Sequence, residues 1–402
     1  MFYPPFDGES VGIYTYTRAF ALLGHRVTVL AMNTPKHHYS VADIPAEEKA
    51  LASYETVFVN TRLNPLKAFI NLFGKGSYNV ERFISDAFAK RLIAYLQQYD
   101  FDIIELESSY LVPYCPIIRQ YSQAPIVVRL QNAEHIIWER LSQETRFLPK
   151  RLYLQLLAKR MKQFELNLHK HCDALLPVSP EDAAFFRDVA KADKPMFLLP
   201  FSLDTKLYPH QNTATQAPNS LFFLAAFDWA ANTQGLFWFL NHAWQTLHQQ
   251  HPQLKLYVAG RKMTDDMKQQ LSQYPHVLPI GEVPDAAQFM HQHDIMLVPL
   301  QVGSGMRVKI IEGMAVGKPI IATSIAAEGI NYSDGKNILI ADTPTQFIDQ
   351  INRCIANADY TQNIGKEARI FAETEHDVLA ITQKLIDFYK TLHNKQAIAW
   401  QQ

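Results

Sequence analysis

Val298-Pro-Leu-Gln-Val-Gly-Ser-Gly-Met-Arg-Val-Lys-Ile-Ile-Glu-Gly-Met-Ala-Val-Gly-Lys-Pro319 is the stretch that decides the fold of this 402-residue chain. An apolar run leads into Gly303-Ser304-Gly305, and helical periodicity begins at once with Met306. A buried strand, a short glycine loop and a helix in this order are typical of a βα unit in a parallel sheet. Glycines let the backbone approach a ligand closely, and the first free amides of a helix bind phosphate. The stretch therefore predicts a phosphate-binding loop at the carboxyl end of a strand.

Charged residues follow this loop at positions that suit a nucleoside diphosphate. Arg307 and Lys309 lie in the first turns of the expected helix and could neutralise a diphosphate, which arginine can bind bidentately. Glu312 lies about two turns into the helix, where a carboxylate could accept both hydroxyls of a ribose. The residues alone leave a second interpretation open, in which Ser304 is only a helix N-cap and Glu312 only an exposed helix residue.

Strand and helix patterns alternate on both sides of this stretch, which predicts parallel sheets wound on both faces. The predicted strands are Arg26–Ala31, Asp102–Glu107, Ile126–Leu130, Ala174–Val178, Leu221–Ala226, Leu254–Ala259, Val277–Ile280, Ile295–Pro299, Pro319–Ala322 and Ile338–Ile340. The predicted helices are Val11–Leu23, Val80–Gln98, Arg151–His171, Asn232–Gln250, Asp285–His291, Met306–Val316 and Thr345–Ala356. The fold class is therefore α/β, with doubly wound, Rossmann-like parallel sheets.

A proline-rich connector interrupts this alternation near the middle of the chain. Pro195, Pro200, Pro209 and Pro218 punctuate a region that includes the polar stretch His210–Ser220. A chain of 402 residues exceeds one ordinary core, so two domains are expected. We place the domains at residues 1–198 and 199–375, followed by a C-terminal segment over residues 376–402.

The first domain lacks an expected opening strand. The chain passes from Met1-Phe2-Tyr3 directly into Pro4-Pro5-Phe6-Asp7-Gly8, which supplies a loop and its helix without a strand before them. A central strand contributes on the order of 5–10 kcal/mol, comparable to the stability of a domain. A misplaced start codon, a truncation and another segment in the gap all remain open explanations.

Composition excludes several classes of protein. Hydrophobic residues make up 48% and charged residues 19%, as in a globular protein, and the net charge of −1 gives no overall positive field for nucleic acid. Cys115, Cys172 and Cys354 show no paired spacing, which favours a reducing compartment over a disulfide framework or zinc site. No apolar run approaches the roughly 18–20 residues that span a bilayer, and no signal peptide is evident. We expect a soluble, cytoplasmic protein.

The segment Lys150–Lys170 is basic and amphipathic. Lysines and arginines recur in it among apolar residues, at Lys150, Arg151, Lys159, Arg160, Lys162 and Lys170. One interpretation is a helix packed on a sheet with a solvated basic face. The other is weak docking to a membrane surface that holds a lipid-linked acceptor.

The glycine-loop stretch resembles the donor-binding loop and helix of retaining glycosyltransferases of the GT-B fold, glycosyltransferase family four. Similar stretches in the same half are Lys318-Pro-Ile-Ile-Ala-Thr-Ser324, Ala327-Glu328-Gly329-Ile330, Phe227-Asp228-Trp229 and Val258-Ala259-Gly260-Arg261. In the first half, Arg129-Leu-Gln-Asn-Ala-Glu134-His-Ile-Ile-Trp138-Glu-Arg140 and Pro177-Val-Ser-Pro-Glu-Asp182 look like the acceptor domain of that family. The likeness runs from the Gly8 loop to about residue 370.

The resemblance implies a sugar transferase with an N-terminal acceptor domain and a C-terminal donor domain. It implies that the last helix, around Val378–His393, returns to the first domain. The substrates would be a nucleotide-sugar, UDP- or GDP-linked, and a glycan or lipid-linked acceptor, in polysaccharide or cell-envelope glycan synthesis. Retention of configuration and catalysis without a bound metal or cofactor are likewise implied by the resemblance alone.

The resemblance also assigns roles to individual residues. Catalysis would fall to Arg307, Lys309 and Glu134. Donor binding would use Gly303, Ser304, Gly305, Met306, Arg307, Lys309, Glu312, Arg261 and Asn232. The acceptor or cleft side would use Gly8, Glu107, Gln131 and Asn132.

Three departures from the family pattern bear on activity. Ser304 stands where the family usually has the first of two glutamates, and Gln131 stands where relatives tend to have a histidine. The stretch Leu221–Asn241 holds no lysine or arginine, so Arg261 is expected to share the charge of the diphosphate with the loop cations. A catalytically impaired sugar-nucleotide-binding or scaffold protein of the same fold is therefore the alternative. An oxidoreductase is disfavoured because no G-x-G-x-x-G follows a strand.

Other polar and aromatic candidates keep two interpretations. Asp228 and Asn232 either cap the helix that starts beside them or contact the donor. Glu105 and Glu107 end a strand, where they either orient an acceptor hydroxyl or form salt bridges. Tryptophans in α/β proteins are more often core than sugar-stacking residues, and this applies to Trp138, Trp229 and Trp238.

Overall fold

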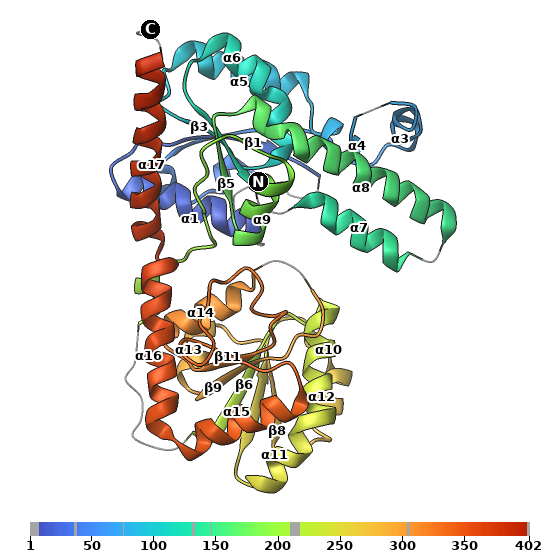
Figure 1. The fold of residues 1–402 in the computed structure, drawn as a ribbon, viewed down its shortest axis with the longest axis vertical. Coiled ribbons are helices and arrows are strands. Elements are labelled where there is room, and N and C mark those ends of the chain that lie inside the picture. The colour runs from blue at the N-terminus through green and yellow to red at the C-terminus, as the bar shows by residue number, and fades with distance from the viewer. Residues whose placement is uncertain are drawn as a thin grey trace. The chain divides into compact units, whose positions relative to one another are not determined.

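The computed structural model describes residues 8–35, 38–74, 76–130, 133–145, 147–209, 218–303 and 306–399 (Figure 1). The chain divides into two compact units. Unit 1 comprises residues 1–201 and 379–402, and unit 2 comprises residues 202–378. The sequence analysis placed these boundaries at 198 and 375, within three residues of the observed ones.

Unit 2 is built on one continuous parallel sheet. Its strands lie in the order β11-β10-β9-β6-β7-β8 and pair in parallel throughout. They are β6 Ser220–Leu224, β7 Lys255–Ala259, β8 Val277–Gly281, β9 Ile295–Val298, β10 Ile320–Ala322 and β11 Leu339–Ile340. Each corresponds to a strand that the sequence predicted, and the doubly wound order confirms the predicted fold class.

Helices cover both faces of this sheet, as Figure 1 shows. They are α10 Ala230–Phe239, α11 Gln245–Gln250, α12 Asp265–Leu271, α13 Ala286–His291, α14 Val308–Val316, α15 Pro344–Ala356 and α16 Ala358–Glu375. A π-helical turn, Leu240–Trp244, joins α10 to α11, so the predicted helix Asn232–Gln250 is one helical run with a bulge. Trp244, Phe239 and Phe347 are fully buried in the core beneath it.

The carboxyl ends of the central strands approach one another closely. Gly260 follows β7 with φ +145°, and a Cβ there would lie 1.6 Å from the carbonyl oxygen of Ala225, just after β6. Only glycine fits this contact. In the doubly wound order the chain leaves β6 toward β7 on one side, while β9 lies on the other, which makes β6 and β9 the strands of the topological switch point.

Unit 1 contains two separate parallel sheets. One pairs β1 Thr28–Asn33 with β2 Ser53–Phe58, and the other has the order β3-β4-β5. Its strands are β3 Ile104–Leu106, β4 Ile126–Leu130 and β5 Ala174–Pro177. The sequence predicted all of these strands except β2.

Helices surround these two sheets. They are α1 Gly8–Leu22, α2 Ala46–Lys49, α3 Pro65–Asn71, α4 Tyr78–Glu81, α5 Asp86–Gln98, α6 Cys115–Tyr121, α7 Glu134–Glu144, α8 Leu148–Leu168, α9 Pro180–Ala184 and α17 Val378–Ala399. The single helix predicted over Val80–Gln98 is wrong, because α4 and α5 are separate. Ser85 caps α5 by accepting a hydrogen bond from the amide of Phe88 at 3.4 Å. Most of α17 belongs to unit 1, where Tyr389 donates a hydrogen bond to Glu105 at 2.8 Å.

A cavity of about 1710 Å³ lies in unit 1 between the two sheets. The backbone of residues 27–32 lines one side of it, and Ile103, Glu105 and Glu107 line the other. Helices α1 and α17 contribute Tyr16 and Ile386. Among the described strands, β1 pairs only with β2 and β3 only with β4, so both sheets present an edge toward this space.

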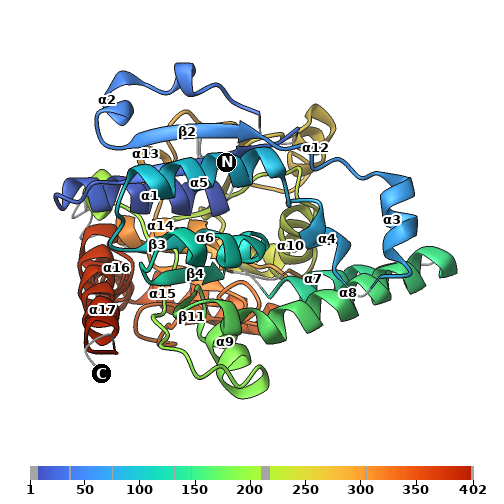
Figure 2. The same ribbon diagram turned by 90° about the horizontal axis from the view of Figure 1, so that it is seen from above.

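Three elements of unit 1 extend away from its sheets. Figures 1 and 2 both show α3, α7 and α8 reaching outward on the same side of the unit. Arg160 of α8 fastens the end of α3 by donating to the backbone oxygens of Asn71, Leu72 and Gly74 at 2.7, 2.9 and 2.6 Å. The predicted helix Arg151–His171 is confirmed as α8, with an earlier start.

Candidate functional site

The glycine loop of unit 2 follows β9 at the topological switch point. Gly303 adopts φ +136°, and a Cβ there would lie 2.3 Å from Nη2 of Arg307 and 3.1 Å from the ring of Trp229. Trp229 follows β6, so the loops after both switch-point strands meet at this glycine. Ligands of doubly wound sheets bind at this place.

Arg307 lies directly before the helix that follows the loop. The guanidinium carbon stacks 4.9 Å from the ring centre of Trp229, and the side chain is buried. The residue occupies the N-cap of α14, so the helix begins at Val308 and not at Met306 as predicted. Ser304, the N-cap candidate of the sequence analysis, lies outside the described residues. Free amides at the beginning of α14 and a cation are placed together, which suits an anionic ligand.

Lys309 lies in the first turn of α14 and contacts two neighbouring side chains. Its Nζ donates to Oδ1 of Asn232 at 2.9 Å and lies 5.0 Å from the ring centre of Phe223. Burial, with Arg307 adding to it, lowers the pKa of Lys309 to about 7. The lysine is poised to take up a proton when a negative charge arrives.

Asn232 connects this lysine to the loop after β6. Its Nδ2 donates to the carbonyl oxygen of Ala226 at 2.7 Å, which leaves Oδ1 for Lys309. The N-cap of α10 is Trp229 without a side-chain bond, so the cap interpretation of Asn232 is wrong. The amide instead fixes the direction of the lysine.

Glu312 faces Tyr208 within unit 2. The tyrosine hydroxyl donates to Oε1 of Glu312 at 3.1 Å, and the glutamate is half-buried, so its reading as an exposed helix residue is wrong. Burial raises the pKa of Glu312, while the Tyr208 hydrogen bond and Lys309 oppose that rise. A carboxylate held in this way keeps a second oxygen available to accept hydroxyl groups.

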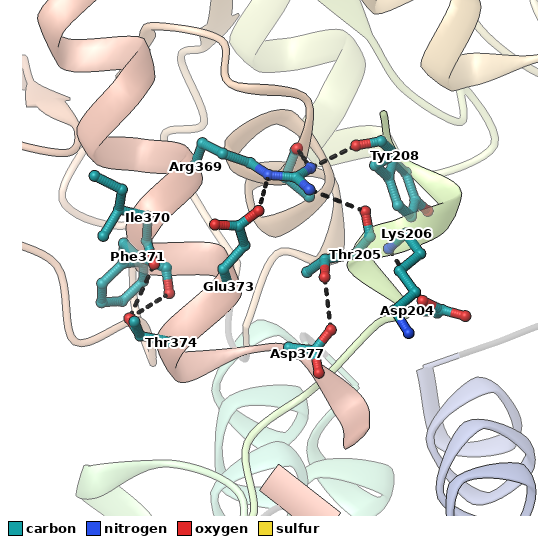
Figure 3. A network of polar contacts seen from close by, with 11 residues as sticks. Asp204, Thr205, Lys206, Tyr208, Arg369, Ile370, Phe371, Glu373, Thr374 and Asp377 are labelled. Carbon is teal, nitrogen blue, oxygen red and sulfur yellow. Dashed lines mark hydrogen bonds and ion pairs between the residues drawn. The ribbon is translucent and has the colours of Figure 1, made fainter. Parts of the chain in front are cut away.

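Arg369 of α16 holds the segment that carries Tyr208. Figure 3 shows its guanidinium donating to the carbonyl oxygens of Tyr208 and Thr205. The same guanidinium donates to the carbonyl oxygen of Ala315 in the last turn of α14. Its Nε also binds Glu373 at 2.6 Å. Below it, the Thr205 hydroxyl donates to Asp377 at 2.6 Å. One side chain thus ties the Tyr208 loop to the helix that carries Glu312.

The remaining predicted donor residues lie around this loop with less definite placement. Met306 is close to Gly329, where a Cβ would approach the Met306 Cβ to 3.5 Å. Arg261 is exposed after β7, and its carbonyl oxygen accepts from the amide of Phe227 at 2.9 Å. Ser304 and Gly305 lie outside the described residues.

A second polar cluster lies at the carboxyl ends of β3 and β4 in unit 1. Arg129 is buried, donates to Glu107 at 3.2 Å and stacks 4.8 Å from the ring centre of Tyr16. Glu105 lines the cavity and accepts from Tyr389. Burial first, and Glu107 second, raise the pKa of Glu105 to about 8. The strand-end interpretation of Glu107 as an ion-pair partner is confirmed.

Glu134 begins α7 and is held by two contacts. Its carboxylate accepts from the Tyr110 hydroxyl at 2.9 Å, and its amide donates to Glu165 at 2.7 Å. Burial raises the pKa of Glu134. Gly8 begins α1, while Gln131 and Asn132 lie outside the described residues.

The tryptophans divide between core and site. Trp138 packs in a small cluster with Leu154 and Leu157 of α8, and Trp238 packs against the core of unit 2 beside Phe347. Trp229 is 39% exposed, and the guanidinium of Arg307 stacks on its ring. Trp229 is therefore the tryptophan that contributes to the site.

Two searches of the described residues limit other interpretations. No group of three histidine, cysteine, aspartate or glutamate side chains within the described ranges is arranged to hold a metal ion. In the same residues, no helix combines the length and apolar character that crossing a membrane requires. The three cysteines are buried and unpaired.

Comparison with known proteins finds a family that is similar to part of unit 2. Residues 218–357 match the family described as glycosyl transferases group 1. The fold is that of GT-B glycosyltransferases. An uncharacterised protein of the cps region of Klebsiella pneumoniae is 21% identical over 259 residues, which are 62% of this chain. An uncharacterised glycosyltransferase of Methanocaldococcus jannaschii is 30% identical over 91 residues, or 22% of this chain.

These two alignments span 65% and 26% of the relatives' own lengths. Solved structures match over nearly the whole chain. HepE of Anabaena in complex with UDP is 16% identical, with a TM-score of 0.62 over 96% of this chain and 97% of HepE. Sucrose-phosphate synthase of Thermosynechococcus elongatus is 15% identical, with a TM-score of 0.65 over 97% of this chain and 94% of that protein. At these identities the likeness establishes the fold.

The candidate site of unit 2 includes residues that the sequence analysis missed. Tyr208 and Arg369 complete the surroundings of Glu312, yet neither belongs to a recognisable motif. Tyr208 lies in the connector between units, and Arg369 lies in α16, which was not predicted. Only the contacts of the folded chain bring them to α14.

Proposed function

We propose that this protein transfers a sugar from a nucleoside-diphosphate sugar, UDP- or GDP-linked, to a glycan or lipid-linked acceptor. The observation that carries the proposal is the position of Gly303, Arg307 and Lys309 at the beginning of α14. Amides, a stacked guanidinium and a buried lysine there match a diphosphate in charge and geometry. The bound UDP in the HepE structure, a protein of the same fold, supports UDP as the first donor to test.

In the proposed reaction, Arg307 and Lys309 stabilise the leaving nucleoside diphosphate. Its negative charge grows as the bond to the sugar breaks, and preorganised cations in a buried site stabilise that charge most. Lys309, with a pKa of about 7, takes up a proton as the diphosphate binds and then holds a full positive charge. These protein cations take the role for which other transferases use a metal ion.

Glu312 accepts the ribose hydroxyls in this proposal, and Tyr208 orients its carboxylate. Unit 1 binds the acceptor, with Glu134 and Glu107 as the carboxylates that orient or deprotonate its hydroxyl. We further propose membership in glycosyltransferase family four, retention of configuration, and a cytoplasmic location at the inner face of the membrane. The Klebsiella relative of the cps region favours a role in polysaccharide or cell-envelope glycan synthesis.

The test is nucleotide release from UDP-, GDP- and ADP-sugars with a membrane extract as acceptor source. We expect acceptor-dependent release from one donor, and a loss of roughly 2–4 kcal/mol in transition-state stabilisation for Arg307→Ala. Arg353→Ala is the matched control, because Arg353 also stacks on an aromatic ring, Tyr360 at 4.0 Å, but belongs to α15.

Two results would contradict the proposal. Unchanged release by Arg307→Ala would remove the assignment of the leaving-group site. Nucleotide binding without release from any donor would favour the sugar-nucleotide-binding protein that Ser304 and Gln131 suggested. Calorimetry of UDP binding to the same variants separates these two cases.

A further inference from the structure

The short helix α3 of unit 1 and the turn that follows it have an outward face made of large apolar side chains. Leu66, Phe69, Ile70 and Phe73 recur at spacings of three and four residues, which places them on one side of the helical turn. All four are exposed, up to 81% for Phe73. Phe69 and Phe73 contact edge to face with ring centres 5.5 Å apart. Contiguous exposed groups of this kind mark interaction sites.

The opposite side of α3 is fastened to the unit, so the apolar face is presented by a fixed support. Ala68 packs against the cluster of Leu154 and Leu157 in α8. Asn71 is buried and accepts from Arg160 at 2.8 Å. Small and polar side chains therefore attach α3 to α8, while the large apolar side chains of α3 point to the solvent.

The beginning of α8, the helix to which α3 is fastened, also exposes both apolar and basic groups. Phe147, Leu148 and Leu152 are exposed, and Lys150, Arg151 and Lys159 are exposed beside or along the same helix. Residues 61–74 and 145–164 contain no aspartate or glutamate. Glu81, near the end of α3, accepts from the Asn71 amide at 2.9 Å.

We propose that α3 and the first turns of α8 form a docking surface for a lipid bilayer that carries anionic headgroups. Large apolar groups enter the boundary between headgroups and acyl chains, and lysines and arginines bind the phosphates around them. The cations of this surface decide against a second copy of the chain, because pairing the same surfaces would bring like charges together. The basic helix noted in the sequence is one part of this surface, and α3 is the part that the sequence did not indicate.

Sedimentation of the full chain with vesicles tests the proposal. We expect binding to vesicles that contain phosphatidylglycerol, weaker binding to pure phosphatidylcholine, and loss of the difference at high salt. Lys150→Glu with Arg151→Glu should weaken binding to the anionic vesicles about tenfold or more. Phe69→Ser with Phe73→Ser should abolish binding to both.

Matched controls come from unit 2 of the same chain. Leu207→Ser with Leu278→Ser removes exposed apolar groups, and Lys255→Glu with Lys366→Glu reverses exposed charges. These variants should bind vesicles as the unchanged chain does, and thermal unfolding of every variant confirms that the fold is kept.

Three outcomes would overturn the proposal. The chain could sediment no better with vesicles than alone, or the control variants could weaken binding as much as the surface variants. The phenylalanine variant could instead convert a dimer to a monomer in light scattering without any lipid effect, which would make this surface a contact between copies. The proposal goes beyond sugar transfer, and no donor enters the assay, so its failure leaves nucleotide release untouched.

Discussion

Within the residues that the structure describes, unit 2 has one continuous parallel sheet, whereas unit 1 has two shorter parallel sheets. In unit 2 the chain runs from β6 through α10 to β7, and β6 lies between β7 and β9. In unit 1 the chain runs through α1 to β1, and the cavity lies between β1 and β3. The cavity thus has the place in unit 1 that β6 has in unit 2.

The difference teaches what a central strand does for a doubly wound unit. Parallel neighbours are joined by crossover helices, so a helix that leads into β1 and lines the cavity has the position of a crossover from a strand beside β1. In unit 2 the central strand position is filled by β6, whose side chains Leu221, Phe222 and Phe223 are fully buried. In unit 1 the corresponding space borders Glu105 and the edges of two sheets.

The largest expected effect comes from placing a strand in this cavity. A six-residue apolar strand joined ahead of Met1, equal in length to β1, should stabilise unit 1 by on the order of 5 kcal/mol. It would bury apolar side chains and satisfy two strand edges at once. Hydrogen exchange measured on peptides of β1 and β3 should slow, while peptides of β6 and β9 should not change.

The control extension has the same length with lysine at alternate positions, since buried charges oppose insertion. Equal protection from both extensions would contradict the comparison, because the effect would then not depend on filling an apolar strand position. No change from the apolar extension would show that the cavity does not accept a strand.

The second prediction concerns the stability of unit 2, which depends in part on the contacts of Arg369. Arg369→Leu removes charge-assisted hydrogen bonds to Tyr208, Thr205 and Ala315, and should destabilise unit 2 by about 3 kcal/mol. Urea unfolding followed by hydrogen exchange should show faster exchange in α14, with unit 1 unaffected. The control is Arg187→Leu, whose exposed pair with Asp188 is expected to contribute very little. Equal destabilisation by both variants would contradict the role given to Arg369.

The third prediction is an opposite pH dependence of the two units. In unit 1, folded Glu105 keeps its proton up to about 8, whereas the unfolded chain loses it near 4.5. The folded state binds more protons between these values, so the unfolding free energy of unit 1 falls as pH rises through that window. In unit 2, folded Lys309 loses its proton near 7 and the unfolded chain near 10.5, so the unfolding free energy rises with pH between them.

Each slope is at most about 1.4 kcal/mol per pH unit for one proton. Exchange of β4 peptides reports unit 1, and exchange of β9 peptides reports unit 2, after correction for the intrinsic pH dependence of exchange. Glu105→Gln should flatten the first slope and Lys309→Met the second. Slopes of the same sign, or slopes that survive these substitutions, would contradict the assigned titrations.

The sequence predicts the elements that depend on neighbouring residues, and it does not predict the contacts between residues that lie far apart in the chain. The strands of unit 2 were predictable because apolar runs such as Ile295–Val298 end in loop residues, and the glycine loop indicated the place of the ligand. The split between α4 and α5 was not, because Ser85 gave a capping signal inside a continuous helical pattern. Tyr208 and Arg369 were not either, since they reach the donor helix from 104 and 54 residues away in sequence.

The difference in protonation between Arg307 and Lys309 was also not predictable from the sequence. Arg307 and Lys309 were expected as two similar cations on the first turns of a helix. The structure separates them, because Arg307 stacks on Trp229 while Lys309 is buried against Asn232 and Phe223. Burial, which depends on packing across the sheet, gives the lysine its lowered pKa.

The smallest predicted effect concerns the tyrosine that the connector brings into unit 2. Tyr208→Phe removes the hydroxyl that donates to Glu312 but keeps the backbone oxygen that Arg369 binds. It should therefore weaken UDP binding in calorimetry by about 1 kcal/mol, the value of one hydrogen bond, while leaving the unfolding of unit 2 nearly unchanged. Tyr360→Phe is a control from the same unit. A loss of stability equal to that of Arg369→Leu would mean that the ring, not the hydroxyl, holds the loop, and Glu312 would then be oriented by its helix alone.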